Sequence, residues 1–391
     1  MARIFRAQGR HALPLGALLL CAAALSGCPV LESLIVLDPL DTLGVNADTI
    51  SVRPPPHTPD VSTGTGGASP GRSPRTPHID VGDAVAGSAH GGFLREVLRI
   101  SYGDDATELT TAPVAISQVV DSGAFSKRIE FTTVDLQDAG LLPPDGTLNV
   151  IPLDGIPLCR EHGLIVDIPE GGLSFTPELY IGTSYTDGRL VAFQSYVRGA
   201  LQLSLDLRVA VDEESPAVFE KDLFPPLRKP FTTYIGDLPV FGVAELRFVA
   251  GMQAYFDGDT HFTTGFTVNA PLEYEVVQEF GLYNRYTQFG PVDFSGHAPE
   301  WNFEVGSDIY FYLSVIAGIS LYGAADFEFQ ATPYLQTNTH VTPPPQSFSL
   351  SAGLDIDTYC GLHLFDYRLH DRTRSYRLGP RELYYWSSTG D

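Results

Sequence analysis

Three pairs of acidic residues have the types and spacing that most suggest chemistry in this 391-residue chain. The pairs are Glu273 and Glu275, Asp326 and Glu328, and Asp355 and Asp357. Each lies in a segment where polar and apolar residues alternate, which is typical of a β-strand with one buried face. Because residues i and i+2 of a strand point to the same side, the carboxylates of each pair share one sheet face about 7 Å apart.

These six carboxylates suggest a calcium site. If their strands were neighbours in one sheet, the rows of hard oxygen ligands would suit Ca²⁺. The simpler alternative, which we favour, is that the acids form the solvated outer face of a sheet and that the protein carries no cofactor.

Catalytic residues are not predicted. The chain contains no HExxH string, the helical motif of zinc-dependent hydrolases. His363, Asp366 and His370 are close together in the sequence. On a strand, however, His363 would point away from the other two, so a joint metal site would need a turn between them.

The first 28 residues have the layout of a targeting segment. Three arginines precede the apolar stretch 13–25, as in a secretory signal peptide. The stretch runs into the four residues Leu25, Ser26, Gly27 and Cys28. This box resembles the lipobox of bacterial lipoprotein precursors, although an ordinary secretory leader with an incidental cysteine is the alternative. The resemblance implies a signal peptide over residues 1–27, a lipid on Cys28 and a location in the bacterial cell envelope. Because Pro29 rather than aspartate follows Cys28, it implies the outer membrane.

The charge balance limits the partners. The formal net charge is −23, and removing a leader with three arginines and no acids leaves −26. So acidic a surface repels nucleic acid and favours divalent cations or basic partners. Charged residues make up only 18% of the chain, so the acidity comes from a shortage of Lys and Arg.

Two cysteines remain once the leader is cleaved and Cys28 is lipidated. Cys159 and Cys360 would then lie in an oxidising compartment, where we expect them to form a disulfide. Such a bridge would contribute about 5 kcal/mol through the unfolded state. The alternative is two separate buried thiols.

Composition divides the mature chain into four parts. Residues 28–50 form the lipidated N-terminus, and residues 51–92 are rich in Pro, Gly, Ser and Thr. A segment of that composition buries too little apolar area to fold, so it is predicted to be a disordered linker. Two β-rich halves follow at 93–223 and 231–391, separated by a Pro-rich connector, and we expect them to form one cooperative unit.

Turn signals predict two hairpins. Asp187 and Gly188 separate two alternating segments, as do Asp257 and Gly258, and such pairs suit tight hairpin turns. A short strand is predicted at Val114–Val120, and no long amphipathic helix is predicted after residue 93.

The longest apolar run after the leader, Ile309–Gln330, predicts two central strands that meet near Ala317 and Gly318. Its first half has apolar or aromatic residues on both faces, as in a strand that is buried on both sides. A similar segment around Gly251 is the expected partner. The predicted fold class is therefore all-β, with antiparallel β-sandwich-like domains behind the linker.

The function that these features favour is a lipid-anchored cell-envelope protein with a β-rich binding, adhesion or structural module. The expected partners are the membrane, through the lipid on Cys28, and envelope polysaccharide or another surface protein. One alternative is an envelope hydrolase that acts on polysaccharide. A second alternative is a membrane β-barrel, because alternating strands of about 10 residues fit one.

Overall fold

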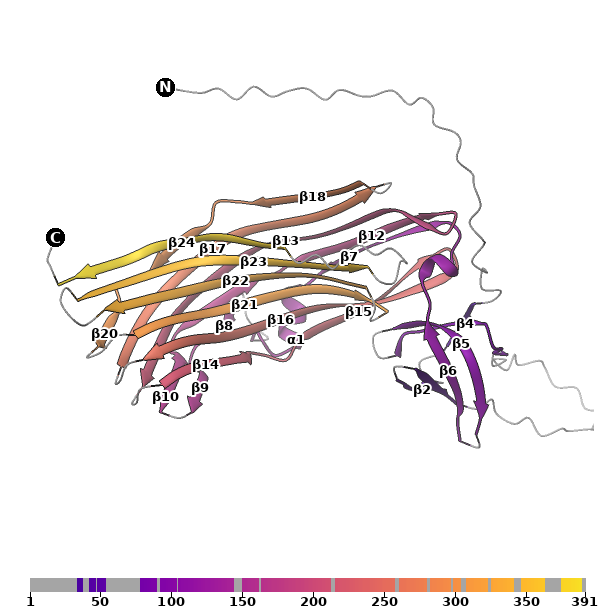
Figure 1. Cartoon of the computed structure of the whole chain (residues 1–391), viewed down its shortest axis with the longest axis horizontal. Helices are drawn as coiled ribbons and strands as arrows, with labels where there is room; N and C mark the ends of the chain where they lie inside the picture. Colours follow the sequence, from indigo (N-terminus) through magenta and orange to yellow (C-terminus); the bar gives the residue numbers. More distant parts are fainter. Residues whose placement is uncertain are drawn as a thin grey trace, which may run out of the picture.

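The alternating sequence forms β-structure along most of the chain that the structure describes (Figure 1). The computed structural model describes residues 34–37, 42–46, 48–53, 78–89, 92–103, 105–143, 150–161, 163–211, 215–256, 260–279, 282–296, 298–303, 307–322, 325–340, 346–362 and 374–388. The helices η2 (Ile116–Gln118, a 3₁₀ helix) and α1 (Thr133–Asp138) are short. The predicted all-β class is therefore confirmed. The predicted strand at Val114–Val120 is wrong, because η2 occupies its centre.

A small antiparallel sheet with one parallel strand pair forms the N-terminal part. Its strands are β1 (Leu34–Val36), β2 (Thr42–Val45), β3 (Thr49–Val52), β4 (Ala84–Gly87), β5 (Phe93–Tyr102) and β6 (Thr107–Pro113). The strand order is β1-β4-β5-β6-β3-β2, and β1 and β4 run parallel. Fully buried Ile50, Val85 and Val97 lie in its own apolar cluster.

The small sheet changes the predicted linker boundaries. The start of the 51–92 segment belongs to β3, and β4 lies within the segment. Residues 54–77 lie outside the described residues, as do the leader and Cys28. The folded part of the chain therefore begins well before Phe93.

An eleven-stranded sheet forms one face of the large body. Its strands are β7 (Gly123–Glu130), β8 (Ile151–Pro152), β9 (Ile156–Glu161), β10 (Leu164–Ile168), β11 (Gly171–Phe175), β12 (Glu178–Thr186), β13 (Arg189–Val211), β17 (Thr260–Glu279), β18 (Leu282–Phe289), β19 (Asp293–Gly296) and β20 (Glu300–Phe303). Strand β13 organises this sheet, because β10, β11, β12 and β17 all pair with it.

A seven-stranded sheet forms the other face. Its strands are β14 (Ser215–Asp222), β15 (Leu227–Ile235), β16 (Leu238–Phe256), β21 (Ser307–Leu321), β22 (Ala325–His340), β23 (Ser347–Leu362) and β24 (Arg374–Ser387). The order is β14-β16-β21-β22-β23-β24, and β15 pairs with the other end of β16. The Pro-rich segment after β14 thus joins two strands that both pair with β16.

The two large sheets pack face to face over one core. Their inward side chains form a single apolar cluster that includes residues from both β-rich halves of the sequence. At one margin β7 lies beside β15, where the Lys229 ammonium donates a hydrogen bond to the Glu130 carbonyl at 2.7 Å. At the other margin β19 lies beside β24. Figure 1 shows the small sheet at one end of this large body.

Side-chain alternation decides which face of each strand is buried. On β13, Leu201, Leu203 and Leu205 are almost completely buried, whereas Gln202 and Ser204 are exposed. Burial of each leucine contributes about 1.5–3 kcal/mol, which fixes the register of the strand. The alternation therefore predicted the orientation of these side chains.

One predicted hairpin is confirmed and the other is wrong. Asp187 and Gly188 have φ angles of 50° and 65°, and they connect paired strands β12 and β13. The residues on either side of Asp257 and Gly258 do not form a hairpin, because β16 belongs to the seven-stranded sheet and β17 to the eleven-stranded sheet. Asp257 and Gly258 themselves lie outside the described residues.

The apolar run Ile309–Gln330 lies at the centre of the seven-stranded sheet. It forms most of β21 and the start of β22, so the strand continues through Ala317 and Gly318 instead of turning there. Strand β21 pairs with β16, and Tyr312 lies opposite Gly251. The expected partner of the run is therefore correct, although the expected turn is not.

The predicted disulfide is wrong. Cys159 lies half-buried on β9 of the eleven-stranded sheet, whereas Cys360 is buried on β23 of the seven-stranded sheet, and the two are not bonded. Figure 1 shows β9 near one end of the long sheets, while β23 ends just after Cys360 near the other end. Packing of both sheets over one core joins the two halves without a bridge.

Candidate functional site

The structure brings Glu328, Asp355 and Asp357, from two of the three acidic pairs, onto one surface. Strands β22 and β23 are neighbours, and Asp355 and Asp357 lie opposite Thr332 and Gln330. Glu328 is on the same outer face and lies diagonally next to Asp357. The backbone of Asp326 pairs with Gly361, but its side chain lies outside the described part of the structure.

The third pair lies on the other side of the molecule. Glu273 and Glu275 are on β17, on the outer face of the eleven-stranded sheet. Glu273 accepts a hydrogen bond from Arg198 at 2.7 Å, and Glu275 accepts one from Gln194. Within the described residues, no three His, Cys, Asp or Glu side chains come together as metal ligands. The rows predicted for calcium therefore do not converge in that part of the chain.

A pocket of about 370 Å³ opens on the outer face of the seven-stranded sheet. Side chains from β14, β16, β21, β22 and β23 line it, so it extends across five neighbouring strands. We call it the tyrosine pocket, after Tyr310 and Tyr312 in its wall. Asp355 and Asp357 also line it, so one predicted acidic pair belongs to the site.

Tyr310 and Tyr312 form the aromatic side of the tyrosine pocket, and the buried ring of Tyr334 packs against Tyr310. The ring centroid of Tyr310 lies 5.9 Å from that of Tyr312 and 5.2 Å from that of Tyr334. Tyr312 leans over Gly251 on β16, and Tyr334 leans over Gly353 on β23. A Cβ atom at either glycine would lie 2.3 Å from the tyrosine ring. The glycines therefore allow the rings to lie close to the sheet.

Neutral polar side chains lie beside the rings. The hydroxyls of Ser314 and Thr332 are 2.9 Å apart, and the Gln330 amide donates to them at 3.1 and 3.2 Å. Ser314 and Thr332 are buried, at 1% and 7% exposure. This network holds the Gln330 side chain in place and leaves its amide oxygen available to a ligand.

Charged side chains flank the network and the rings. Both oxygens of Asp355 accept hydrogen bonds from Arg377, each at 2.8 Å. Asp357 accepts from the Ser375 hydroxyl, and Glu220 accepts from the Tyr312 hydroxyl at 2.7 Å. Such paired geometry fixes the carboxylates before a ligand arrives.

The surroundings of the tyrosines keep their hydroxyls protonated. Burial raises the pKa of Tyr310 to about 12, and the negative charge of Asp355 adds to the effect. Burial also raises the pKa of Tyr312 to about 12, together with its hydrogen bond to Glu220. The hydrogen bond from Arg377 to Asp355 raises the pKa of Arg377. The pocket therefore offers neutral phenols, and the guanidinium group that holds Asp355 stays charged.

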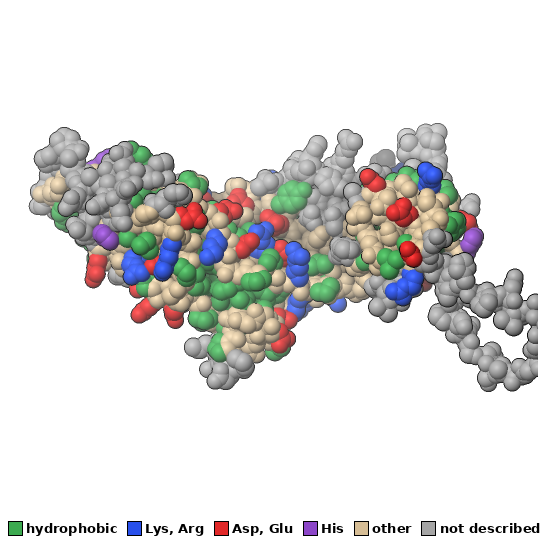
Figure 2. All heavy atoms as spheres, turned by 90° about the horizontal axis from the view of Figure 1, so that it is seen from below, with side chains coloured by type: hydrophobic (Ala, Val, Ile, Leu, Met, Phe, Trp, Pro, Cys, Tyr) green, Lys and Arg blue, Asp and Glu red, His purple; other side chains and the backbone are tan. Residues whose placement is uncertain are grey.

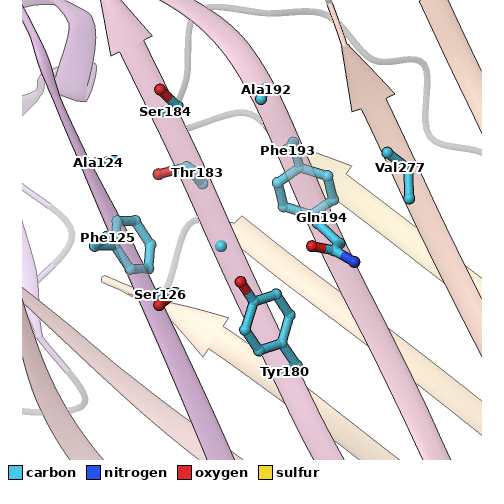
Figure 3. A pocket seen from close by; sticks show the side chains of 11 residues that line it. Ala124, Phe125, Ser126, Tyr180, Thr183, Ser184, Ala192, Phe193, Gln194 and Val277 are labelled. Atoms are coloured by element: carbon cyan, nitrogen blue, oxygen red, sulfur yellow. The ribbon is translucent and has the colours of Figure 1, made fainter.

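A second concavity of about 370 Å³ lies on the outer face of the eleven-stranded sheet (Figure 3). Small residues form much of it: Ala124, Ser126, Gly182, Ser184 and Ala192. Tyr180 borders it and stacks on Tyr196 with a centroid distance of 4.9 Å. Fewer polar groups converge here than in the tyrosine pocket, and none of its lining side chains is charged. The tyrosine pocket is therefore the better candidate.

The sequence analysis missed the tyrosines of the site. It interpreted the first half of the apolar run as buried on both faces, but only alternate residues face the core: Ile309, Phe311, Leu313, Val315 and Ala317. Tyr310 and Tyr312 alternate with them and line the pocket. Their period-two spacing next to Ser314 was the signal, and it was hidden because tyrosine was counted with the apolar residues.

No helix among the described residues has the length and apolarity to cross a membrane. Comparison of the chain with protein-family models, curated proteins and solved structures finds no match.

Proposed function

We propose that this is a lipid-anchored protein of the bacterial cell envelope whose β-rich module binds polysaccharide at the tyrosine pocket. The observation that carries the binding proposal is the meeting of aromatic rings, a neutral hydrogen-bonding network and fixed carboxylates in one open pocket. The signal peptide layout and the lipobox ending at Cys28 support the anchor.

A sugar has the two kinds of surface that the tyrosine pocket complements. The C–H groups on one side of a pyranose ring pack against an aromatic face, and its hydroxyls both donate and accept hydrogen bonds. Tyr310 and Tyr312 supply the aromatic side. Gln330 and Asp357 supply acceptors, and Arg247 supplies donors. The volume of about 370 Å³ lies within the range of small-molecule sites.

Hydrolysis of the polysaccharide is the second candidate. Asp355 and Asp357 lie about 7 Å apart on one strand, within the carboxylate separation of inverting glycosidases. However, Asp355 directs both oxygens to Arg377, at 2.8 Å each. A general acid must carry a transferable proton, which this pairing opposes. The geometry therefore favours binding over catalysis.

The membrane β-barrel alternative has less support. The outward side chains of β13 include exposed Gln202, Ser204 and Arg208, while the leucines between them face the core. A membrane barrel has the opposite arrangement, with its apolar side chains outside. The surface in Figure 2 likewise carries interspersed acidic and basic side chains.

Replacing Tyr310 with alanine is expected to weaken binding of the mature chain to its polysaccharide by at least about tenfold. The ligand is first identified on a glycan array, with a Cys28→Ser form that carries no lipid, and affinities are then measured by calorimetry. Tyr180→Ala, on the opposite sheet, is the matched control and should bind like the wild type. Equal binding by both variants, or no glycan bound by the wild type, would refute the proposal.

The lipid anchor is tested separately with the full precursor in a bacterial host. Cells grown with radiolabelled palmitate should incorporate the label into the wild-type protein and not into Cys28→Ser. The variant should also leave the membrane fraction, because lipid chains contribute about 0.8 kcal/mol of membrane affinity for each buried CH₂ group. Retention of the label by the variant would show that Cys28 is not the lipidated residue.

A further inference from the structure

The tyrosine pocket carries an imbalance of charge. Asp355 is neutralised by Arg377, and Arg247 is paired with Asp222 at 2.9 Å. Glu220 and Asp357 have no Lys or Arg partner in the part of the chain that the structure describes. Their hydrogen-bond donors are the neutral hydroxyls of Tyr312 and Ser375. Two lining carboxylates therefore keep an uncompensated negative charge.

These two carboxylates lie at opposite ends of the tyrosine pocket. Glu220 is on β14 and Asp357 is on β23, and the strands between them are β16, β21 and β22. With about 4.8 Å between neighbouring strands, the two positions are roughly 19 Å apart across the sheet. One small cation cannot contact both, whereas a chain with regularly repeated cationic groups can.

A primary ammonium is the cationic group that best suits these two carboxylates. A primary ammonium is compact and offers three donors, so it can bind a carboxylate and still lie over an aromatic face. The rings of Tyr310 and Tyr312, which both line the pocket from β21, provide such faces between the two ends. Ring centroids only 5.2 and 5.9 Å apart leave no slot between the rings for a quaternary ammonium, which would need an aromatic cage.

Other charged ligands fit less well. Ca²⁺ takes six to eight oxygen ligands, and the described residues hold no group of three acidic or other metal-ligating side chains. Polymers of uronic acids carry the same sign of charge as the chain, whose formal net charge is −23. Like charges weaken their approach to the pocket.

We propose that the tyrosine pocket selects polysaccharide built of hexosamine units with free amino groups. Glu220 and Asp357 bind ammonium groups of separate units, and the tyrosine rings and Gln330 contact the sugars between them. This inference rests on the proposed polysaccharide-binding function and adds the class of polymer.

The test measures binding of the unlipidated mature chain to three sets of oligosaccharides of equal length by calorimetry. Oligomers of glucosamine at pH 6, where the amines are charged, should bind at least tenfold more tightly than oligomers of N-acetylglucosamine or glucuronic acid. Affinity should rise with chain length, and the preference should fall with added salt or rising pH. Asp357→Asn and Glu220→Gln should each reduce the preference, and the double variant should abolish it.

Asp206→Asn is the matched control, because it removes the same charge from the outer face of the eleven-stranded sheet and should keep the preference. If N-acetylated oligomers bind as tightly and Tyr310→Ala abolishes their binding, the amino-sugar inference is overturned and the proposed function stands. If no oligosaccharide binds, both fail. Displacement of glucosamine oligomers by a lysine homopeptide at equal charge concentration would instead identify a cationic peptide as the ligand and overturn the inference.

Discussion

Replacing Phe329 with alanine is expected to lower the free energy of unfolding by about 3–5 kcal/mol. Phe329 on β22 is fully buried, and its ring lies 6.2 Å from that of Tyr274 on β17 of the opposite sheet. Removal of the ring leaves a cavity between two rigid sheets that cannot close over it. Urea denaturation followed by circular dichroism and by tyrosine fluorescence measures the change.

Two further variants make the Phe329 result specific. Phe329→Leu keeps most of the volume and should cost less, and Val218→Ala, at a side chain that is 75% exposed, should change stability by less than about 0.5 kcal/mol. Because Phe329 and Tyr274 join the two sheets in one core, the unfolding transitions recorded by circular dichroism and by tyrosine fluorescence should shift together. A loss below about 1 kcal/mol, or two transitions of which only one shifts, would contradict a single core.

Local patterns predicted the strands but only some of their neighbours. The leucines of β13 indicated a strand with one buried face, because burial has a period of two residues. The pair Asp257 and Gly258 was wrongly expected to join two paired strands. Turn residues favour a reversal of the chain, but the long-range packing of both sheets over one core decides which strand is the neighbour.

The small sheet could not be predicted from local pattern. Its outer strands are three or four residues long, and β1 pairs in parallel with β4, which follows it by almost 50 residues in the sequence. Strands this short bury too few side chains to show a period, and a parallel pair leaves no turn signal. The high content of Pro, Gly, Ser and Thr in residues 51–92 therefore led to the prediction of a disordered linker, although β4 lies within this segment.

Part of the candidate site was predictable and part was not. The spacing of Asp355 and Asp357 placed both carboxylates on one outer face, and both line the tyrosine pocket. The position of Glu273 on the opposite sheet depends on pairing between β13 and β17, which spacing along the chain does not reveal. The positions of Tyr312 and Gly251 opposite each other likewise depend on the register between β16 and β21.

Replacing Gly251 with alanine is expected to disrupt the tyrosine pocket while leaving the fold intact. The new Cβ atom would lie 2.3 Å from the Tyr312 ring and hydroxyl, so the ring must move away from the sheet. The displaced ring loses its hydrogen bond to Glu220 and enters water, so the pKa of Tyr312 should fall from about 12 towards its usual value near 10. Polysaccharide affinity should fall by at least about tenfold, which corresponds to about 1.4 kcal/mol.

The pH dependence of stability gives an independent measure of the Gly251→Ala effect. A raised tyrosine pKa means that the folded state holds the proton more tightly. The stabilisation from neutral Tyr312 is therefore complete below about pH 10 and is lost as the pH rises through about 12. The variant should lose less stability than the wild type over this interval, and its ultraviolet titration should show one additional tyrosine ionising near pH 10.

Gly318→Ala is the control, because its Cβ atom meets nothing closer than the Phe327 carbonyl oxygen at 3.1 Å and no tyrosine ring. If Gly251→Ala and Gly318→Ala titrate and bind alike, the close approach of Tyr312 to Gly251 does not shape the pocket.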